Sequence, residues 1–400
     1  MLSDYFSFAI RTFGRRPTRS WLTILGIFIG IAAVVSLISL GQGLQEAVSK
    51  QFERLGTDKV MIFPGSGQMA MLGALGGGKK FSDHDESVVE GVSGVKRVGG
   101  FSSPMATVKF KNEAQSTFVI GMPSGWSISD YGFSLMSGRD LKDGDSGKVV
   151  VGYLLSTGDF FSKSVKIGDR VQIEGQSFEV IGIVERIGSK QDDTQIYITS
   201  DALKSVFNEE GYSFLYVQLN KGQNTTAVAQ AIKEKMRKDR GLKKGQEDFT
   251  VQTLEQLTNT VGAVIGVVQL IVISIAAISL IVGGIGIMNT MYTSVLERTR
   301  EIGVMKAIGA RNSDIMLIFL LESGLIGLVG GAIGVVLGVG GGLATEWIAV
   351  RSGYTLLRVS FPPWLLVGAL AFSFFVGMLS GAIPASNAAR MKPVEALRYE

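Results

Sequence analysis

The sequence predicts an α-helical membrane protein with four transmembrane helices and one large external α+β domain between the first and second helices. Hydrophobic residues make up 46% of the 400 residues and charged residues only 18%, a balance that argues against a purely soluble chain. Four apolar runs with few or no charges are long enough to cross a bilayer. The segment between the first two runs alternates between apolar and polar residues in the manner of β-strands.

The four apolar runs predict transmembrane helices at residues 21–43, 261–290, 314–345 and 363–384. Arginines precede the first run, as they do in a signal peptide, but the run is too long for the apolar core of such a peptide and no small-residue cleavage site follows it. We therefore interpret it as an uncleaved anchor. Glycine is frequent, at 52 residues, which is typical of helices that pack closely in lipid. We expect a multi-pass protein of the plasma or inner membrane.

Basic residues predict the orientation of these helices. They gather before the first helix, between the second and third, and after the fourth, and such clusters mark the cytoplasmic ends of membrane helices. With four helices these three places share one side, so both termini, including residues 1–20, are expected in the cytoplasm and the large domain outside. The net charge of +4 is small, and we expect no nucleic-acid partner. The basic residues are Arg11, Arg15, Arg16, Arg19, Arg298, Arg300, Lys306, Arg311, Arg390, Lys392 and Arg398.

The external domain, expected at residues 44–258, has the pattern of a folded α+β domain. A strand, helix, strand order occurs at residues 59–111 and again at residues 214–253. A strand-rich block with glycine at its turns lies between them. We therefore predict a two-layer subdomain built from both ends of the domain, with a small β subdomain inserted at about residues 138–200.

Residue types that catalyse reactions or hold metals are scarce. There is no cysteine and a single histidine, His84, which excludes disulfides, zinc thiolate sites and thiol catalysis. The stretch GALGGGKK at residues 73–80 nearly matches a phosphate-binding loop, but Lys80 replaces the hydroxyl residue that binds the metal. The stretch GGIGIM from Gly283 is better explained by helix packing than by dinucleotide binding. We expect no catalytic residue, cofactor or metal site in this chain, which is not predicted to be an enzyme.

Two groups of ionisable residues have competing interpretations. The stretch DHDE at Asp83–Glu86 would hold a divalent ion weakly, but acidic residues are expected in the first turn of a helix, so we interpret them as helix capping with Ser82 or Asp83 as the N-cap. Glu322 is the only ionisable residue well inside the predicted transmembrane helices. It is either a functional intramembrane acid or a side chain that reaches the membrane interface or a neighbouring serine or arginine.

The charged segment at residues 297–311, between the second and third transmembrane helices, is predicted to be a short amphipathic helix. Gly309 suits the left-handed residue that ends a helix. Its mixed charge, with Glu297 and Glu301 among the basic residues, and its small apolar side favour a groove on a protein partner over a lipid surface. The apolar positions that predict the helix recur at every third residue, at Ile302, Met305 and Ile308.

Small residues on the first and second transmembrane helices predict close helix packing and a seam between two copies of the protein. Glycine has no side chain, so two helix backbones can approach each other closely in lipid. The glycines assigned to this packing are Gly26, Gly30, Gly283, Gly284 and Gly286.

The stretch ERTREIGVMKAIGARNSDIMLIFLLESGLIGLVGGAIGVVLG closely resembles the signature of the FtsX-like permease domain, which is found in ABC transporter subunits of the MacB and LolC/LolE type. RRPTRSWLTILGIFIGIAAVV resembles the first span of that family, GQGL its outward continuation, and GAIPASNAARMKPVEALRYE its usual ending. The external domain resembles in layout the porter-like fold of the family. The resemblance covers nearly the whole chain and implies a permease domain at residues 259–400 behind a MacB-like core domain.

The resemblance also implies a mechanism. In this family the segment between the second and third helices is a coupling helix that sits in a groove of a cytoplasmic ABC ATPase, which binds the ATP. Closure of the ATPases is transmitted to the external domains, a mode called mechanotransmission. By position, the residues that would contact the ATPase are Glu297, Arg298, Arg300, Glu301, Ile302, Met305, Lys306 and Gly309.

We therefore expect the permease subunit of an ABC transporter that exports or mobilises a hydrophobic or peptide-like substrate. In MacB the ATPase precedes the permease in the same chain, whereas here the first helix begins near residue 21, so we expect a separate ATPase chain, as in LolC/LolE. The other expected partners are the lipid bilayer, a second permease copy or paralogue, and an external adaptor or substrate-delivery protein. One alternative is a non-transporting subunit that regulates an external partner such as a cell-wall hydrolase, and another is a membrane receptor without an ATPase.

Overall fold

The computed structural model describes residues 17–56, 58–67, 80–208 and 211–397, which form two compact units. The helical unit consists of the described parts of residues 1–44, 264–348 and 358–400, and the α/β unit of those of residues 45–263 and 349–357. Several features discussed above lie outside the described residues: Arg11, Arg15, Arg16, Arg398, and residues 73–79 of the glycine-rich stretch.

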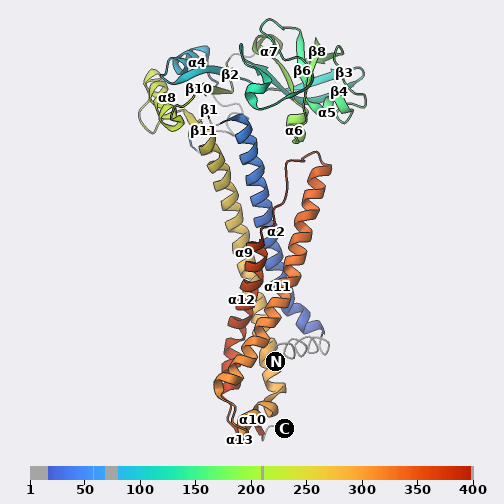
Figure 1. Cartoon of the computed structure of the whole chain (residues 1–400), viewed down its shortest axis with the longest axis vertical. Coiled ribbons are helices and arrows are strands. Elements are labelled where there is room, and N and C mark those ends of the chain that lie inside the picture. The colour runs from blue at the N-terminus through green and yellow to red at the C-terminus, as the bar shows by residue number, and fades with distance from the viewer. Residues whose placement is uncertain (1–16, 57, 68–79, 209–210, 398–400) are drawn as a thin grey trace. The chain divides into compact units, whose positions relative to one another are not determined.

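Among the described residues, four long helices carry apolar stretches that are long enough to cross a membrane (Figure 1). The four predicted transmembrane helices are therefore confirmed. Each helix extends beyond its predicted bounds at one end or both, because backbone hydrogen bonding continues into polar sequence where the apolar run has ended. The helices are α2 (Pro17–Leu55), α9 (Leu254–Glu297), α11 (Asn312–Arg351) and α12 (Pro363–Arg390).

Two short helices, α10 (Thr299–Ala307) and α13 (Pro393–Leu397), lie together at one end of the helical unit (Figure 1). Gly309 has a φ of 104°, in the left-handed region, and it follows the end of α10 as predicted. The helix is shorter than the predicted 297–311, because α9 continues through Glu297 and the chain turns toward α11 after Ala307.

Glycines let the long helices of one chain pack backbone against backbone. A Cβ added at Gly26 would lie 2.8 Å from the Cα of Gly283, and one added at Gly327 would lie 3.0 Å from the Cα of Gly377. A Cβ at Gly284 would lie 2.6 Å from a hydroxyl of α12. The face of α2 that carries Gly26 and Gly30 is therefore filled by α9 of the same chain. The predicted seam between two copies cannot use this face, which is a correction to the sequence analysis.

The α/β unit contains a four-stranded antiparallel sheet with the order β11-β1-β10-β2. Side chains from α4 and α8 pack with side chains from the sheet in one hydrophobic cluster that includes Val60, Val89, Val217 and Ile232. The prediction of a two-layer subdomain built from both ends of the domain is borne out. The elements are β1 (Lys59–Pro64), α4 (Asp83–Glu90), β2 (Val95–Phe101), β10 (Phe214–Leu219), α8 (Thr225–Asp239) and β11 (Phe249–Thr253).

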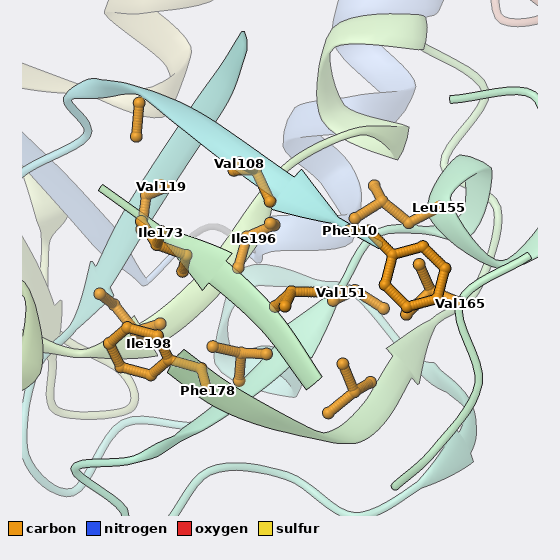
Figure 2. Packing of buried hydrophobic residues seen from close by; sticks show 14 of the residues in the cluster. Val108, Phe110, Val119, Val151, Leu155, Val165, Ile173, Phe178, Ile196 and Ile198 are labelled. Carbon is orange, nitrogen blue, oxygen red and sulfur yellow. The ribbon is translucent and has the colours of Figure 1, made fainter. Parts of the chain in front are cut away.

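The second sheet has seven strands in the order β5-β8-β6-β9-β4-β3-β7, and β8 also pairs with β7. Figure 2 shows its interior, where Phe110, Ile173 and Ile196 are among the buried side chains. The strands are β3 (Met105–Phe110), β4 (Glu113–Met122), β5 (Leu135–Gly138), β6 (Lys148–Val151), β7 (Arg170–Ile173), β8 (Gln176–Val184) and β9 (Ile196–Thr199). Four short helices accompany them: η1 (Ile128–Tyr131), α5 (Tyr153–Thr157), α6 (Lys190–Asp193) and α7 (Ser200–Phe207).

This inserted subdomain is larger than the predicted block at residues 138–200. It begins at Met105, because β3 pairs with β7 and β4 runs parallel to β9, with Val119 opposite Ile196. Alternation along a strand shows which face is buried but does not identify the neighbouring strand. The prediction therefore associated β3 with the wrong sheet and left β4 outside the inserted subdomain.

Candidate functional site

The paired helices α10 and α13 form the region in which the predicted coupling residues lie. A Cβ added at Gly303 would lie 2.9 Å from the Cβ of Ala396, so the absence of a side chain at Gly303 permits this close approach. Ala396 is buried, at 3% exposure. Pro393 begins α13, a position that proline favours because its missing N–H has no helical acceptor. In the sequence, PVEAL is part of a stretch that resembles the usual ending of the family, and in the structure the helix that it forms is part of this region.

Lys306 connects α10 to the end of α12 by hydrogen bonds. Its Nζ donates hydrogen bonds to the carbonyl oxygens of Ala389 and Met391, at 2.5 and 2.6 Å. The last carbonyls of a helix have no partner within the helix, and the helix dipole favours a positive charge there. Lys306 is thus occupied inside the protein, rather than being turned toward a partner as predicted.

Arg298 joins the start of α10 to α11. One of its guanidinium nitrogens lies 3.1 Å from a carboxylate oxygen of Glu322, and the two side chains are 20% and 14% exposed. Breaking such a pair would leave a charge in surroundings that solvate it poorly. Of the two interpretations of Glu322, the structure supports the contact with a neighbouring arginine.

The remaining predicted coupling residues divide between the core and the surface. Ile302 is completely buried, and Met305 is partly buried against the same hydrophobic cluster. Ile308, by contrast, is 82% exposed. The predicted apolar stripe is therefore corrected: each step of three residues turns a helix by about 300°, so two steps displace the side chain by about 120° around the axis. The exposed members of the predicted set are Glu297, Arg300, Glu301 and Gly309.

Four apolar side chains outside the predicted set of ATPase contacts are exposed on α10, α13 and the residue that follows α10. They are spaced by three or four residues along each segment, which places each pair on one face of its helix. Large apolar side chains exposed together are common at interaction sites. We call these residues the apolar end surface: Val304 (48% exposed), Ile308 (82%), Val394 (71%) and Leu397 (46%).

The acidic stretch at the start of α4 caps a helix, as interpreted from the sequence. The backbone N–H of Asp85 donates to Ser82 Oγ at 3.3 Å, and the N–H of Ser82 donates to Asp85 Oδ2 at 2.9 Å. Asp83 accepts a hydrogen bond from the Tyr212 hydroxyl instead, and His84 lies 3.0 Å from Asp239. Within the described part of the chain, no three histidine, cysteine or acidic residues group as metal ligands would.

Asp85 also accepts two hydrogen bonds from Arg240, at 2.9 and 2.8 Å. Burial by itself would raise the pKa of Asp85, but the hydrogen bonds from Ser82 and the Arg240 guanidinium outweigh it and hold the pKa below its ordinary value. The carboxylate therefore stabilises the fold of the α/β unit.

The chain matches two protein families over most of its length. Residues 20–235 match the MacB-like periplasmic core domain, and residues 273–393 match the FtsX-like permease C-terminal domain. The second match contains α10, α11 and α12 and ends at Pro393, the first residue of α13.

Curated relatives match the chain from end to end. An uncharacterized ABC transporter permease of Methanocaldococcus jannaschii, MJ1507, is 37% identical, and the alignment covers 100% of this chain and 98% of the relative. The uncharacterized ABC transporter permease YknZ of Bacillus subtilis is 30% identical, with 96% of this chain and 95% of the relative covered. The macrolide export ATP-binding/permease protein MacB of Bdellovibrio bacteriovorus is 30% identical, and 98% of this chain aligns with 61% of that protein.

Two solved structures are similar to part of the chain. The periplasmic region of MacB from Actinobacillus actinomycetemcomitans is 18% identical with a TM-score of 0.44, covering 54% of this chain and 97% of that structure. The extracellular domain of the transporter YknZ is 21% identical with a TM-score of 0.39, covering 49% of this chain and 100% of that structure.

Proposed function

Since this chain belongs to the family of MacB/FtsX-type ABC transporter permeases, we propose that it transmits ATP-driven motion from a separate cytoplasmic ABC ATPase to its external domain. In this proposal the α/β unit is the external domain, both termini are cytoplasmic, and the subunit itself catalyses no reaction. Its work is to export or mobilise a hydrophobic or peptide-like substrate. The alternative, in which the same motion regulates an external partner such as a cell-wall hydrolase, uses the same coupling region.

The observation that carries the proposal is the two-sided character of α10. Its inner side is held by three contacts: the Arg298–Glu322 pair, buried Ile302, and the hydrogen bonds of Lys306 to the end of α12. Its outer side presents the apolar end surface and exposed charges such as Glu301. A partner that pushes on the outer side would therefore move α9, α11 and α12 together with α10.

The relatives support an ATPase on a separate chain. The two proteins that align over nearly their whole length are named permeases, whereas the MacB relative, named an ATP-binding/permease protein, aligns over 61% of its length. A second permease, either an identical copy or a paralogue, is proposed to cover part of α9. That helix exposes Val264, Leu270 and Ile278 at 61%, 65% and 64%, and these side chains require lipid or protein against them.

Co-purification of the cognate ATPase with coupling-region variants tests this function. Ile308→Ala removes an exposed apolar anchor, and Glu301→Lys reverses an exposed charge. A hot-spot anchor contributes about 2 kcal/mol, so the Kd of the ATPase is expected to rise by more than about tenfold. Both variants should keep normal expression, because substitutions at exposed positions usually change stability by about 0.5 kcal/mol or less.

Ile383→Ala is the matched control, because Ile383 is also exposed, at 57%, but lies within the membrane-spanning part of α12. It should retain the ATPase at the level of the parent protein. Parent-level binding by both Ile308→Ala and Glu301→Lys would rule out this surface as the ATPase contact.

A further inference from the structure

The end of α11 and the first part of the segment that connects it to α12 belong by their contacts to the α/β unit. Residues Ala349–Leu357, which we call the strap, pack with that unit although the chain before and after them belongs to the helical unit. The backbone N–H groups of Thr355 and Leu356 both donate to the carbonyl oxygen of Gly188, at 2.7 and 3.2 Å. The side chain of Leu356 packs against the hydrophobic cluster that contains Ile187.

The backbone on both sides of this contact is shaped for close approach. Gly188 has a φ of 98°, and a Cβ there would lie 2.5 Å from Thr355 Oγ1. Gly353 has a φ of 93°, and a Cβ there would lie 3.1 Å from the Cβ of Lys190. Glycine adopts positive φ without steric cost. The strap therefore fits the loop between β8 and α6, which we call the anchor loop, through two glycines whose replacement by a larger residue would disturb the contact.

Asp193 stabilises the conformation of the anchor loop through hydrogen bonds to its backbone. Its side chain is buried, with the residue 1% exposed, and its carboxylate accepts hydrogen bonds from the N–H groups of Ile187 and Gly188, at 2.6 and 3.0 Å. A buried carboxylate is costly unless such hydrogen bonds compensate it. Those two bonds orient the loop so that the Gly188 carbonyl points at the strap.

The two sheets are connected to the helices by different routes. The chain passes from α2 almost directly into β1 and from β11 directly into α9, and Leu257 of α9 packs on Phe63 of β1. These connections reach the four-stranded sheet. The strap instead reaches the loop between β8 and α6, which belongs to the seven-stranded subdomain.

We propose that the strap carries movement of α11 and α12 to the seven-stranded subdomain, and that Asp193 is the positioning residue of its anchor. The inference rests on the proposed transmission of motion and adds a second route for it. Helices α2 and α9 move the four-stranded sheet, and α11 and α12 move the seven-stranded subdomain. A movement of one helix pair relative to the other therefore moves the two sheets relative to each other.

The first experiment lengthens the chain on both sides of the strap's contact with Gly188, and it leaves that contact itself unchanged. In the cysteine-free chain, Gln176→Cys and Trp364→Cys, both at exposed positions, carry spin labels on the seven-stranded subdomain and on α12. Their distance distribution is measured in the full permease with its ATPase, with and without ATP and vanadate. Flexible glycine-serine insertions are placed after Arg351 and after Leu357, and the matched control has the same insertions after Gly144, where a Cβ would have no neighbour within 4 Å.

The parent protein and the control are expected to show a nucleotide-dependent shift, and the protein with the insertions at the strap is expected to lose most of it while still hydrolysing ATP. An undiminished shift in that protein would overturn the role of the strap. If the parent protein shows no shift with its ATPase bound, the transmission function itself is wrong, and that result is distinct from failure of the strap alone.

The second experiment tests Asp193 by the nucleotide-dependent shift and by amide hydrogen exchange in the strap. Asp193→Asn leaves one loop N–H without its acceptor and should reduce the shift, whereas Asp192→Asn removes the neighbouring carboxylate, which accepts from Gln195 instead, and should not. The N–H groups of Thr355 and Leu356, which donate to the Gly188 carbonyl, should exchange with solvent faster in Asp193→Asn than in the parent protein and at the parent rate in Asp192→Asn. Exchange at the parent rate in Asp193→Asn would show that Asp193 does not act by positioning the strap.

Discussion

At the scale of single residues, the charged side chains of the coupling region have roles that the sequence pattern could not separate. Arg298 and Lys306 were both predicted as contacts for the ATPase, because the family resemblance implies that role for their positions. Their hydrogen-bond partners lie 24 and 83 residues away in the chain. Local sequence contains no sign of such distant acceptors. Arg300 and Glu301 are exposed, as predicted. Among the described residues, no contact buries them in the way that Arg298 and Lys306 are buried.

Replacing Lys306 with methionine should loosen α10 without removing its apolar stem. Two carbonyl oxygens at the end of α12 would lose their donor, and each lost hydrogen bond costs about 1 kcal/mol. Amide hydrogen exchange in residues 299–307 should therefore become faster. Lys392→Met is the control, because Lys392 is 77% exposed and, among the described residues, pairs with Glu395 in the same turn. Equal protection of α10 in the parent and in Lys306→Met would contradict this role.

Asp85→Asn should destabilise the α/β unit by about 2 kcal/mol at neutral pH, because it removes a charged acceptor from Ser82 and Arg240. The pKa of Asp85 is lowered in the folded protein, so its contribution is fully present above the pKa of about 3.9 in the unfolded chain and is lost as the pH falls through the folded value. The difference between parent and variant in chemical denaturation should therefore shrink below about pH 4. Asp83→Asn, at a side chain that is 78% exposed, should show a smaller effect, and a deficit that grows toward acid pH would disprove the assignment.

At the scale of elements, length and apolar content made the long helices predictable, whereas pairing between elements was not. The run beginning near Trp21 could only be buried in lipid or protein, and the structure has a helix there. The sequence of β4 is compatible with pairing in either sheet, because its pairing with β9 depends on residues far along the chain. In the coupling region, the end of α10 followed from Gly309, but its contact with α13 depended on Gly303 meeting Ala396 across a long separation.

Gly303→Ala should separate α10 from α13. The new methyl group would lie 2.9 Å from the Cβ of Ala396, and relieving such overpacking typically costs about 1–3 kcal/mol. The variant should unfold at a lower temperature and bind its ATPase more weakly. Gly340→Ala in α11 is the matched control, because a Cβ there would meet nothing within 4 Å and alanine favours a helix over glycine by about 1 kcal/mol. Similar losses in both variants would indicate a general effect of the substitution instead.

At the scale of the whole molecule, the division into two units follows the charge pattern of the chain. The segment between the second and third helices and the chain after the fourth, both basic, lie in the helical unit, whose short helices α10 and α13 are formed from them. The folded sheets lie in the other unit. The proposed function, with an ATPase on one side and an external domain on the other, requires that these two regions face opposite sides of the membrane.

Single cysteines introduced into this cysteine-free chain test that orientation. Ser124 in the α/β unit and Ser313 at the start of α11 are both exposed, so in intact cells only the membrane decides which one a membrane-impermeant maleimide reaches. The basic residues on either side of α10 predict that Ser313 is cytoplasmic, and Arg351 and Arg358 are isolated exceptions near the opposite ends of the helices. Ser124→Cys should react in intact cells, and Ser313→Cys should react only after the cells are opened. The reverse pattern would place α10 outside the cell, beyond the reach of any cytoplasmic ATPase, and would overturn both the orientation and the coupling proposal.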